Sequence, residues 1–470
     1  MLSTKLLHSQ NLSVLLVVTV ALLLRLAPEL AAFPYPIGYD VVNYYIPVVT
    51  DLDAHWSSVS DDFPIYVLIL SFVSGATGLS GHATVSGAGV AIFGIFAGAV
   101  FYAARTLLGR SNLESIFITL FVIVQVAVLR TAWDLHRDIL AISLMLVVFS
   151  LISAKRYHQW HWLAIISSLC CITVALDRMI GLLFVVTLTT ALVTRRDRKI
   201  VLLSLAILSW GVLLFLLAPW LAGETTHLQS ATGNAGKVPA RASGASSIDY
   251  LVLFGILDAA ITVPAIFGLR KSQSVFLGVP MVISGVASFS WLVLPNPASF
   301  VPERWAILFG IFASIIAGYF IVDAITSRRV RHTYFAGSIL AVFAIVGVAY
   351  AILPYESPFP LFALVRGHTE QFMPVTMQFN ALDVHDTDAL LQSIGNINRD
   401  TEGDAVIVGA KHWRGYMELY LEAGRTYKYS ENPGELAAAH ARLGSNVYLI
   451  APADGGKRFE ITHIEDSPRK

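Results

Sequence analysis

The stretch Pro34-Tyr-Pro-Ile-Gly-Tyr-Asp40-Val-Val-Asn-Tyr-Tyr45 follows directly on a first apolar run, residues 12–32. A run of this length is long enough to cross a bilayer as a helix. The aromatic segment after it is therefore expected at the membrane surface, where Asp40 would meet a lipid-linked substrate. Arg25 lies inside the run, near the same end, and is costly there unless it faces protein, water or an anionic partner. Asp40 and Arg25 are thus the first functional candidates; the alternative is that Arg25 reaches the interface and Asp40 caps a helix.

The whole chain is apolar. Of its 470 residues, 56% are hydrophobic and 14% are charged, a composition that predicts a polytopic α-helical membrane protein. Lysine and arginine together number 32, as do aspartate and glutamate, so no basic excess indicates nucleic acid as a partner. The two cysteines, Cys170 and Cys171, are adjacent within an apolar run, which predicts neither a structural disulfide nor a zinc site.

Apolar runs predict about eleven transmembrane helices. They cover residues 12–32, 84–104, 112–130, 138–153, 162–176, 179–194, 199–220, 250–268, 275–294, 305–323 and 334–353. A further apolar stretch, residues 63–79, is ambiguous by hydropathy alone.

The placement of basic residues resolves this ambiguity. Without a span at 63–79, five short basic loops fall on one side of the membrane, and positive charge favours the cytoplasm. These loops carry Arg105 and Arg110, Lys155 and Arg156, Arg195 to Lys199, Arg270 and Lys271, and Arg328 to Arg331. We therefore expect a cytoplasmic amino terminus, retained as an anchor, and a helix at residues 63–79 that lies on the outer surface.

From about residue 355 the composition becomes that of a soluble domain. Residues 404–409 and 446–451 read as short buried strands, and Asn432 and Pro433 are typical of a capped helix start between them. The expected organisation is a multispan domain, residues 1–354, with an outer loop at 33–62, followed by a small extracytoplasmic α/β domain, residues 355–470.

The loop from Arg130 to Asp138 concentrates charge between two spans. Asp134, His136 and Asp138 are oxygen and nitrogen ligands suited to a divalent cation, while Arg137 has the geometry to grip a phosphate. A purely structural cluster of salt bridges at the ends of two helices would have the same composition.

Two further acidic and basic pairs lie at predicted outer ends of helices. Asp177 and Arg178 form a tight turn, and Glu303 and Arg304 open the next-to-last span. Mutual neutralisation for the first pair and interface anchoring for the second are the structural alternatives.

Taken in order, these segments resemble the C-type glycosyltransferases, the multispan enzymes of the GT-C fold that use polyprenyl-phosphate sugars. The family includes protein O-mannosyltransferases, aminoarabinose transferases and the catalytic subunits of oligosaccharyltransferases. The resemblance covers roughly residues 12–325 and depends on the order and sidedness of short motifs. These are Arg25, Gly38-Tyr39-Asp40, the helix from Phe63-Pro64, the loop Trp133 to Asp138, Asp177-Arg178 and Glu303-Arg304.

The resemblance implies roles for these residues. Asp40 would be catalytic, as general base towards the acceptor or as a metal ligand. The metal would be a divalent cation, Mg²⁺ or Mn²⁺, held by Asp40, Asp134, His136 and Asp138. Substrate-binding residues for the lipid phosphate and sugar would be Arg25, Tyr45, Arg137, Arg178, Glu303 and Arg304. Asp40 is followed by Val41 rather than by a second acid, so the family branch and the acceptor (glycan, lipid or protein) stay open.

The expected function is transfer of a sugar from a polyprenyl-phosphate donor to an acceptor on the extracytoplasmic side of the cell membrane. The partners would be the lipid-linked sugar, its acceptor and membrane lipids, with no nucleic acid. The rival is a multispan transporter or lipid flippase, and a third reading is a scaffold that displays the carboxy-terminal domain. Against a transporter, the charges cluster at the outer boundary rather than at the midplane, and no matched pair of broken helices is evident.

Overall fold

The computed structural model describes most of the chain, in the ranges 9–52, 65–195, 246–293, 301–326, 330–380, 382, 384–401, 403–430, 432–443, 445–454 and 458–464. The chain forms two compact units, each described by itself. The helical unit comprises the described residues of 1–28, 56–69 and 87–377, and the α/β unit those of 29–55, 70–86 and 378–470. Helices α2, α5 and α6 contribute residues to both units.

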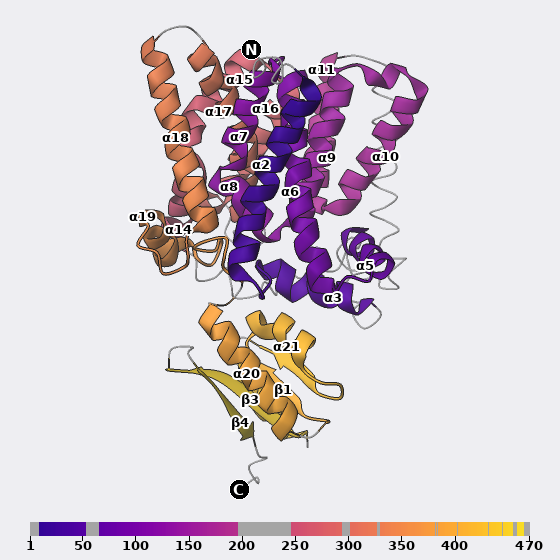
Figure 1. The fold of residues 1–470 in the computed structure, drawn as a ribbon, viewed down its shortest axis with the longest axis vertical. Coiled ribbons are helices and arrows are strands. Elements are labelled where there is room, and N and C mark those ends of the chain that lie inside the picture. Colours follow the sequence, from indigo (N-terminus) through magenta and orange to yellow (C-terminus); the bar gives the residue numbers. More distant parts are fainter. Residues whose placement is uncertain are drawn as a thin grey trace. The chain divides into compact units, whose positions relative to one another are not determined.

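The helical unit is a bundle of long apolar helices (Figure 1). In chain order its elements are α2 (Gln10–Ala32), α5 (Ile65–Thr77), α6 (Gly81–Thr106), α7 (Asn112–Ile123), α8 (Val126–Asp134), α9 (His136–Ser153), α10 (Trp160–Leu176), α11 (Arg178–Arg195), α14 (Ser247–Phe254), the π-helix η5 (Gly255–Ala259), α15 (Ala260–Ser272), α16 (Val275–Ser288), α17 (Pro302–Thr326), α18 (Val330–Ile352), α19 (Pro360–Leu364) and the π-helix η8 (Val365–Thr369).

Helix α17 lies at the centre of this bundle. It is apolar on all sides, as a helix that is enclosed by other helices must be, and it packs against α7, α8, α15, α16 and α18. Its contact with α15 is close, because a Cβ on Gly268 would lie 2.5 Å from the Ile316 carbonyl oxygen. Small residues allow such close packing in a membrane, where the hydrophobic effect does not drive helices together.

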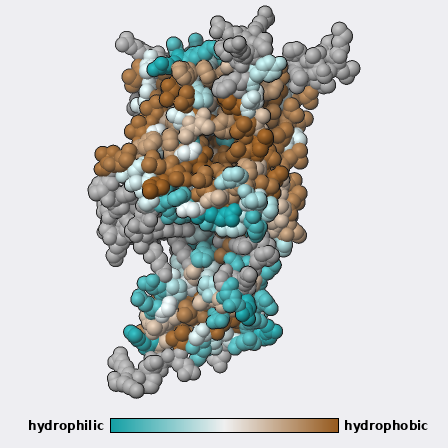
Figure 2. Space-filling model, turned by 90° about the vertical axis from the view of Figure 1, so that its left-hand side faces the viewer, coloured by the Kyte–Doolittle hydropathy of each residue, from teal (hydrophilic) through white to brown (hydrophobic). Residues whose placement is uncertain are grey.

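Six described helices are long and apolar enough to cross a membrane, and α7 with α8 makes a seventh if a 66° bend is allowed within one span. This is the architecture of a helical membrane protein, and Figure 2 shows that hydrophobic side chains cover much of the visible face of the helical unit. Of the other expected spans, α10 is a shorter apolar helix, and the apolar stretches found within α11 and α18 are Met179–Ala191 and Gly337–Ile352. Residues 199–220 lie outside the described part. Eleven spans therefore remain a prediction.

The bend between α7 and α8 falls at Val124 and Gln125. Gln125 is buried and donates a hydrogen bond from Nε2 to the Phe121 carbonyl oxygen, 2.8 Å away, so this carbonyl has a partner at the break. Gly347 of α18 packs against Val124, since a Cβ on Gly347 would lie 1.8 Å from the Val124 carbonyl oxygen. The run 112–130, expected as one span, is thus divided into two helices that can still form one bent span.

Helix α5 is the stretch that was expected at the membrane surface. Its 13 residues make about 20 Å of helix, which is shorter than the apolar core of a bilayer, about 30 Å. That length agrees with the expectation, although its depth in a membrane stays a prediction.

The α/β unit contains a four-stranded sheet. Its strands are β1 (Val406–Gly409), β2 (Thr426–Tyr429), β3 (Val447–Ala453) and β4 (Arg458–Ile464), in the order β2-β1-β3-β4. Strand β1 pairs in parallel with β2 and β3, and β3 pairs antiparallel with β4. The two strands predicted from the sequence are β1 and β3.

Helices cover both faces of this sheet. Successive residues of a strand point to opposite faces: Ile407 joins the core beneath α20 (Val384–Asp400), and Val408 joins the core beneath α22 (Pro433–Ala441). Helix α22 begins at the predicted proline, but Asn432 makes no side-chain capping hydrogen bond.

The segment after α2 also belongs to the α/β unit. It forms the π-helix η1 (Val41–Tyr45) and α3 (Ile46–Thr50), and Val42 is part of the core that α20 and α21 (Arg414–Tyr420) share. Tyr35 donates a hydrogen bond to the Asp388 carboxylate, which raises the pKa of Tyr35 to about 12. The expected outer loop is therefore folded onto residues that lie more than 300 positions later.

Candidate functional site

Arg25 is enclosed by protein in the helical unit. Its side chain is 0% exposed, and Nε donates a hydrogen bond to the Ala132 carbonyl oxygen of α8, 2.9 Å away. A snorkelling arginine would extend its guanidinium group to water. Arg25 instead ties α2 to α8, so the interface alternative does not describe this residue.

His136 lies beside Arg25. It begins α9, is fully buried, and has its Nδ1 atom 3.1 Å from the Tyr66 hydroxyl. Gly89 of α6 makes room for both side chains, because a Cβ there would lie 2.6 Å from the His136 ring and 3.3 Å from Nη2 of Arg25. Any larger residue at position 89 would displace the imidazole.

Arg137 and Asp177 complete this group. Their Nη2 and Oδ2 atoms are 3.9 Å apart, and Oδ1 of Asp177 accepts a hydrogen bond of 2.9 Å from the Ile180 backbone. Asp177 therefore lies just before α11, accepts a hydrogen bond from its first turn and contacts Arg137. Mutual neutralisation with Arg178, the structural alternative, concerns a side chain outside the described part. We call Arg25, Tyr66, Gly89, His136, Arg137 and Asp177 the Arg25 cluster.

A second polar group surrounds Arg130, one turn before Asp134 on α8. Arg130 forms a buried ion pair with Asp134, and its Nε donates a hydrogen bond of 3.0 Å to the Phe372 carbonyl oxygen. Glu303 at the start of α17 interacts electrostatically with Arg130 and Arg304. We call this group, with Tyr250 and Tyr350 nearby, the Arg130 cluster.

Both clusters contain residues that the sequence nominated. Arg25, His136 and Arg137 lie in the first, and Asp134, Glu303 and Arg304 in the second. The two are linked by the short α8–α9 junction at Leu135.

The basic turns lie at the other end of the helical unit. Asp323, near the end of α17, bonds Arg110 at 2.8 Å and also pairs with Lys271. Helix α17 therefore runs from Glu303 in the Arg130 cluster to these two basic residues. Two of the five basic loops thus meet at the end of α17 opposite Glu303, and the side of the membrane on which each end lies stays a prediction.

Asp40 and Tyr45 lie in the α/β unit. Asp40 is half-buried and precedes η1 without a side-chain capping hydrogen bond, so the capping alternative is not observed. Tyr45 is 5% exposed, whereas Tyr44 is 37% exposed and carries the accessible ring of this segment.

Tyr44 belongs to an aromatic group around Arg414. The Arg414 guanidinium carbon lies 6.0 Å from the Tyr44 ring centroid and 5.6 Å from that of Tyr429. Burial raises the pKa of Tyr44, and the charge of Asp40 adds to this effect. Asp40 is thus electrostatically coupled to a cation–π group that the sequence did not reveal.

Two other predicted residues lie in the first turns of helices. Arg178 is the first residue of α11, but its side chain lies outside the described part. Asp138 is buried within the first turn of α9.

A metal centre was predicted at Asp40, Asp134, His136 and Asp138. Within the described ranges, no three histidine, cysteine, aspartate or glutamate side chains gather as metal ligands would. Asp134 pairs with Arg130 and His136 contacts Tyr66. The divalent cation stays a prediction from the resemblance.

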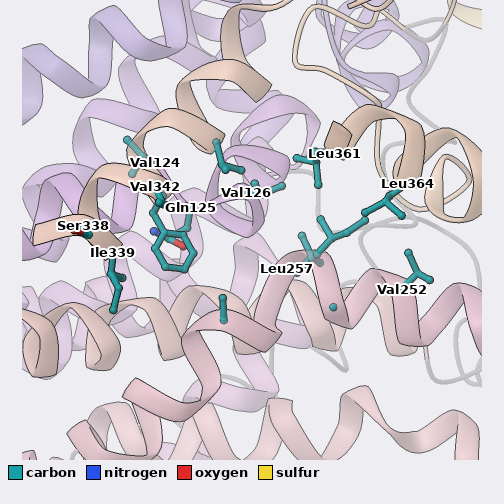
Figure 3. Close-up of a pocket in the computed structure, with 15 residues that line it drawn as sticks. Val124, Gln125, Val126, Val252, Leu257, Ser338, Ile339, Val342, Leu361 and Leu364 are labelled. Carbon is teal, nitrogen blue, oxygen red and sulfur yellow. The ribbon is translucent and has the colours of Figure 1, made fainter. Parts of the chain in front are cut away.

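An apolar cavity of about 720 Å³ lies elsewhere in the helical unit (Figure 3). Its walls include the α7–α8 break at Val124 to Val126, the η5 residues Gly255 to Leu257, and Val342 of α18. Gln125 is its main polar lining group. The cavity is therefore suited to a hydrocarbon ligand.

Hydropathy missed Tyr66 and Asp258 as functional candidates. Tyr66 lies in a short apolar stretch, where a tyrosine is ordinary. Asp258 is the one acidic residue in the run 250–268, and the run as a whole remains strongly apolar despite it. The presence of an aspartate inside such a run is the signal that could have identified Asp258.

No family model and no curated protein matches this sequence.

Proposed function

We propose that this protein is a membrane glycosyltransferase that takes its sugar from a polyprenyl-phosphate donor. The main support is the Arg25 cluster, in which Arg25 and Arg137 lie beside the buried Tyr66–His136 pair. Guanidinium groups match phosphate oxygens in charge and geometry. Arg25 is already held by Ala132, so little side-chain freedom would be lost when an anion binds.

The proposed reaction displaces a lipid phosphate from the anomeric carbon. The acceptor oxygen forms a bond to that carbon, the bond to the phosphate oxygen breaks, and polyprenyl phosphate leaves. Asp40 takes the proton of the acceptor hydroxyl as general base, the role that the resemblance gives it. Arginines stabilise the charge that develops on the leaving phosphate.

The proposed orientation places the basic turns in the cytoplasm and both polar clusters on the extracytoplasmic side. It is supported by the positions of Arg110 and Lys271 at one end of α17 and of Glu303 at the other. A flipped, lipid-linked sugar would be available on that outer side, which a nucleotide sugar would not be.

The rival function, a transporter or lipid flippase, is favoured by one observation. The apolar cavity lies between two helix irregularities, the α7–α8 break and η5, and broken helices line the substrate sites of many transporters. The enzyme is preferred because the cavity lining is almost wholly apolar and does not include the charged residues of either cluster.

One experiment separates the two functions. The purified chain is placed in sealed vesicles that contain a polyprenyl-phosphate sugar with a radiolabel in the sugar, together with envelope glycan, lipid A and peptide acceptors. Release of polyprenyl phosphate with label on an acceptor supports the enzyme. Movement of label or lipid across the membrane with no covalent transfer would support the rival.

A further inference from the structure

Asp258 lies in the middle of a membrane-spanning segment. The span Ser247–Ser272 has 26 residues, and Asp258 is about 17 Å from its start and about 21 Å from its end by helical rise. Ionisable residues at this depth are rare and mark ion or proton sites by default.

The carboxyl group is packed between helices. Asp258 is 1% exposed, and it faces Gly310 of α17 and Ala127 of α8. A Cβ on Gly310 would lie 2.6 Å from Oδ1 of Asp258 and 2.6 Å from the Ala127 Cβ. The glycine therefore leaves just enough space for the carboxyl group.

Neither carboxyl oxygen of Asp258 has a hydrogen-bond partner within the part of the chain that the structure describes. An ionised carboxylate cannot be held in such surroundings without a counter-charge or donors. In this packing the group is consequently a neutral carboxylic acid.

The local backbone is irregular where Asp258 lies. Residues 255–259 form a π-helix between α14 and α15, a feature that is rare and frequently marks functional positions. Its neighbours Ile256 and Leu257 line the apolar cavity, and Leu257 is labelled in Figure 3. A small movement of η5 would therefore change the atoms that contact the Asp258 carboxyl group.

Charged groups on the surrounding elements lie at a distance along their helices. The nearest on α8 is Arg130, three residues from Ala127 and paired with Asp134. On α17, Glu303 and Arg304 are about two turns from Gly310. The remaining titratable groups on the elements packed against η5 are Asp134 on α8, Tyr319 and Asp323 on α17, Asp249 and Tyr250 on α14, and Arg270 and Lys271 on α15.

We propose that Asp258 is an intramembrane proton-binding site. Its carboxyl group holds a proton in the packed arrangement and releases it when movement at η5 supplies a polar partner or water. The site is separate from both arginine clusters, so the proposal does not depend on glycosyl transfer.

Infrared spectroscopy of the full-length protein in nanodiscs tests this directly. A protonated carboxyl group has a carbonyl stretch distinct from that of a carboxylate. In the difference spectrum between wild type and Asp258→Asn at neutral pH, wild type should show one additional carboxylic acid band. Titration over roughly pH 5 to 10 should remove that band reversibly.

Asp323→Asn is the matched control. Asp323 lies at the end of α17 and pairs with Arg110 and Lys271, so its replacement should remove a carboxylate band and leave the acid band intact. Absence of the acid band from wild type would show that Asp258 is ionised and would overturn the proposal. A band that persists unchanged while the protein stays folded would show a buried acid that does not exchange, and would also overturn it.

Discussion

The Tyr66 hydroxyl lies 3.1 Å from Nδ1 of His136, and both side chains are almost completely buried. This contact fixes the imidazole at the first residue of α9, beside Arg25 and Arg137. It makes the Arg25 cluster a preorganised group rather than a set of mobile interface charges.

Tyr66→Phe should destabilise the protein by about 1–3 kcal/mol, because it removes a hydrogen-bond partner from a buried imidazole. Tyr334→Phe is the control, since Tyr334 is 75% exposed and its loss should have little effect. Chemical denaturation in detergent measures both. Equal stability of the two variants would show that the Tyr66–His136 contact contributes nothing.

Gly89→Ala should cost about 1–3 kcal/mol through overpacking and should displace His136, since the new methyl group would lie 2.6 Å from its ring. Gly87→Ala, two residues earlier on the same helix, meets nothing within 4 Å and is a matched control. We expect lower thermal stability and weaker donor binding for the first variant only. A silent Gly89→Ala would contradict the described packing of the cluster.

Substitution by lysine tests the arginines, because lysine keeps the positive charge but lacks the planar guanidinium group that can bind two phosphate oxygens. At least one of Arg25→Lys, Arg137→Lys, Arg178→Lys and Arg304→Lys should lose affinity for a polyprenyl-phosphate sugar while the protein remains folded. Arg110→Lys, at the basic end of α17, should bind as wild type does. Isothermal titration in nanodiscs measures the affinity. If all four variants bind normally, the phosphate site lies elsewhere.

The proposed orientation is tested by reporter fusions at Arg196 and Gly455. The first should report the cytoplasm and the second the outside, because basic connections are retained in the cytoplasm. Reports from the same side at both positions would contradict the proposed topology.

Sequence reasoning recovered the features that depend on local pattern. Apolar runs predicted the long helices, and a short buried run bounded by turn residues predicted strand β1. Features that depend on distant contacts were not predictable. The Gly415 amide donates to Oδ1 of Asn43 at 3.0 Å, and a Cβ on Gly415 would lie 2.0 Å from the Val42 carbonyl oxygen; no spacing in the sequence indicates that these segments meet.

The candidate site shows the same division. Charge in apolar surroundings pointed to Arg25, Arg137 and Glu303, since such residues are conspicuous in hydropathy. Partners such as Tyr66 and Arg414 are ordinary in composition and become significant only through the fold. The bend at Val124 and the π-helix at Gly255 have no strong local signal, because the surrounding residues are uniformly apolar.

Asp40 carries the central claim, and the most direct measurement is the turnover of sugar transfer by purified wild type and Asp40→Asn with a synthetic polyprenyl-phosphate donor. The amide is nearly isosteric with the carboxylate but accepts no proton. If Asp40 is the general base, the rate constant for transfer should fall by about 10²–10⁴-fold, with donor affinity little changed. Transfer by Asp40→Asn at the wild-type rate would exclude Asp40 as the base, and no transfer by wild type with any acceptor would contradict the enzyme itself.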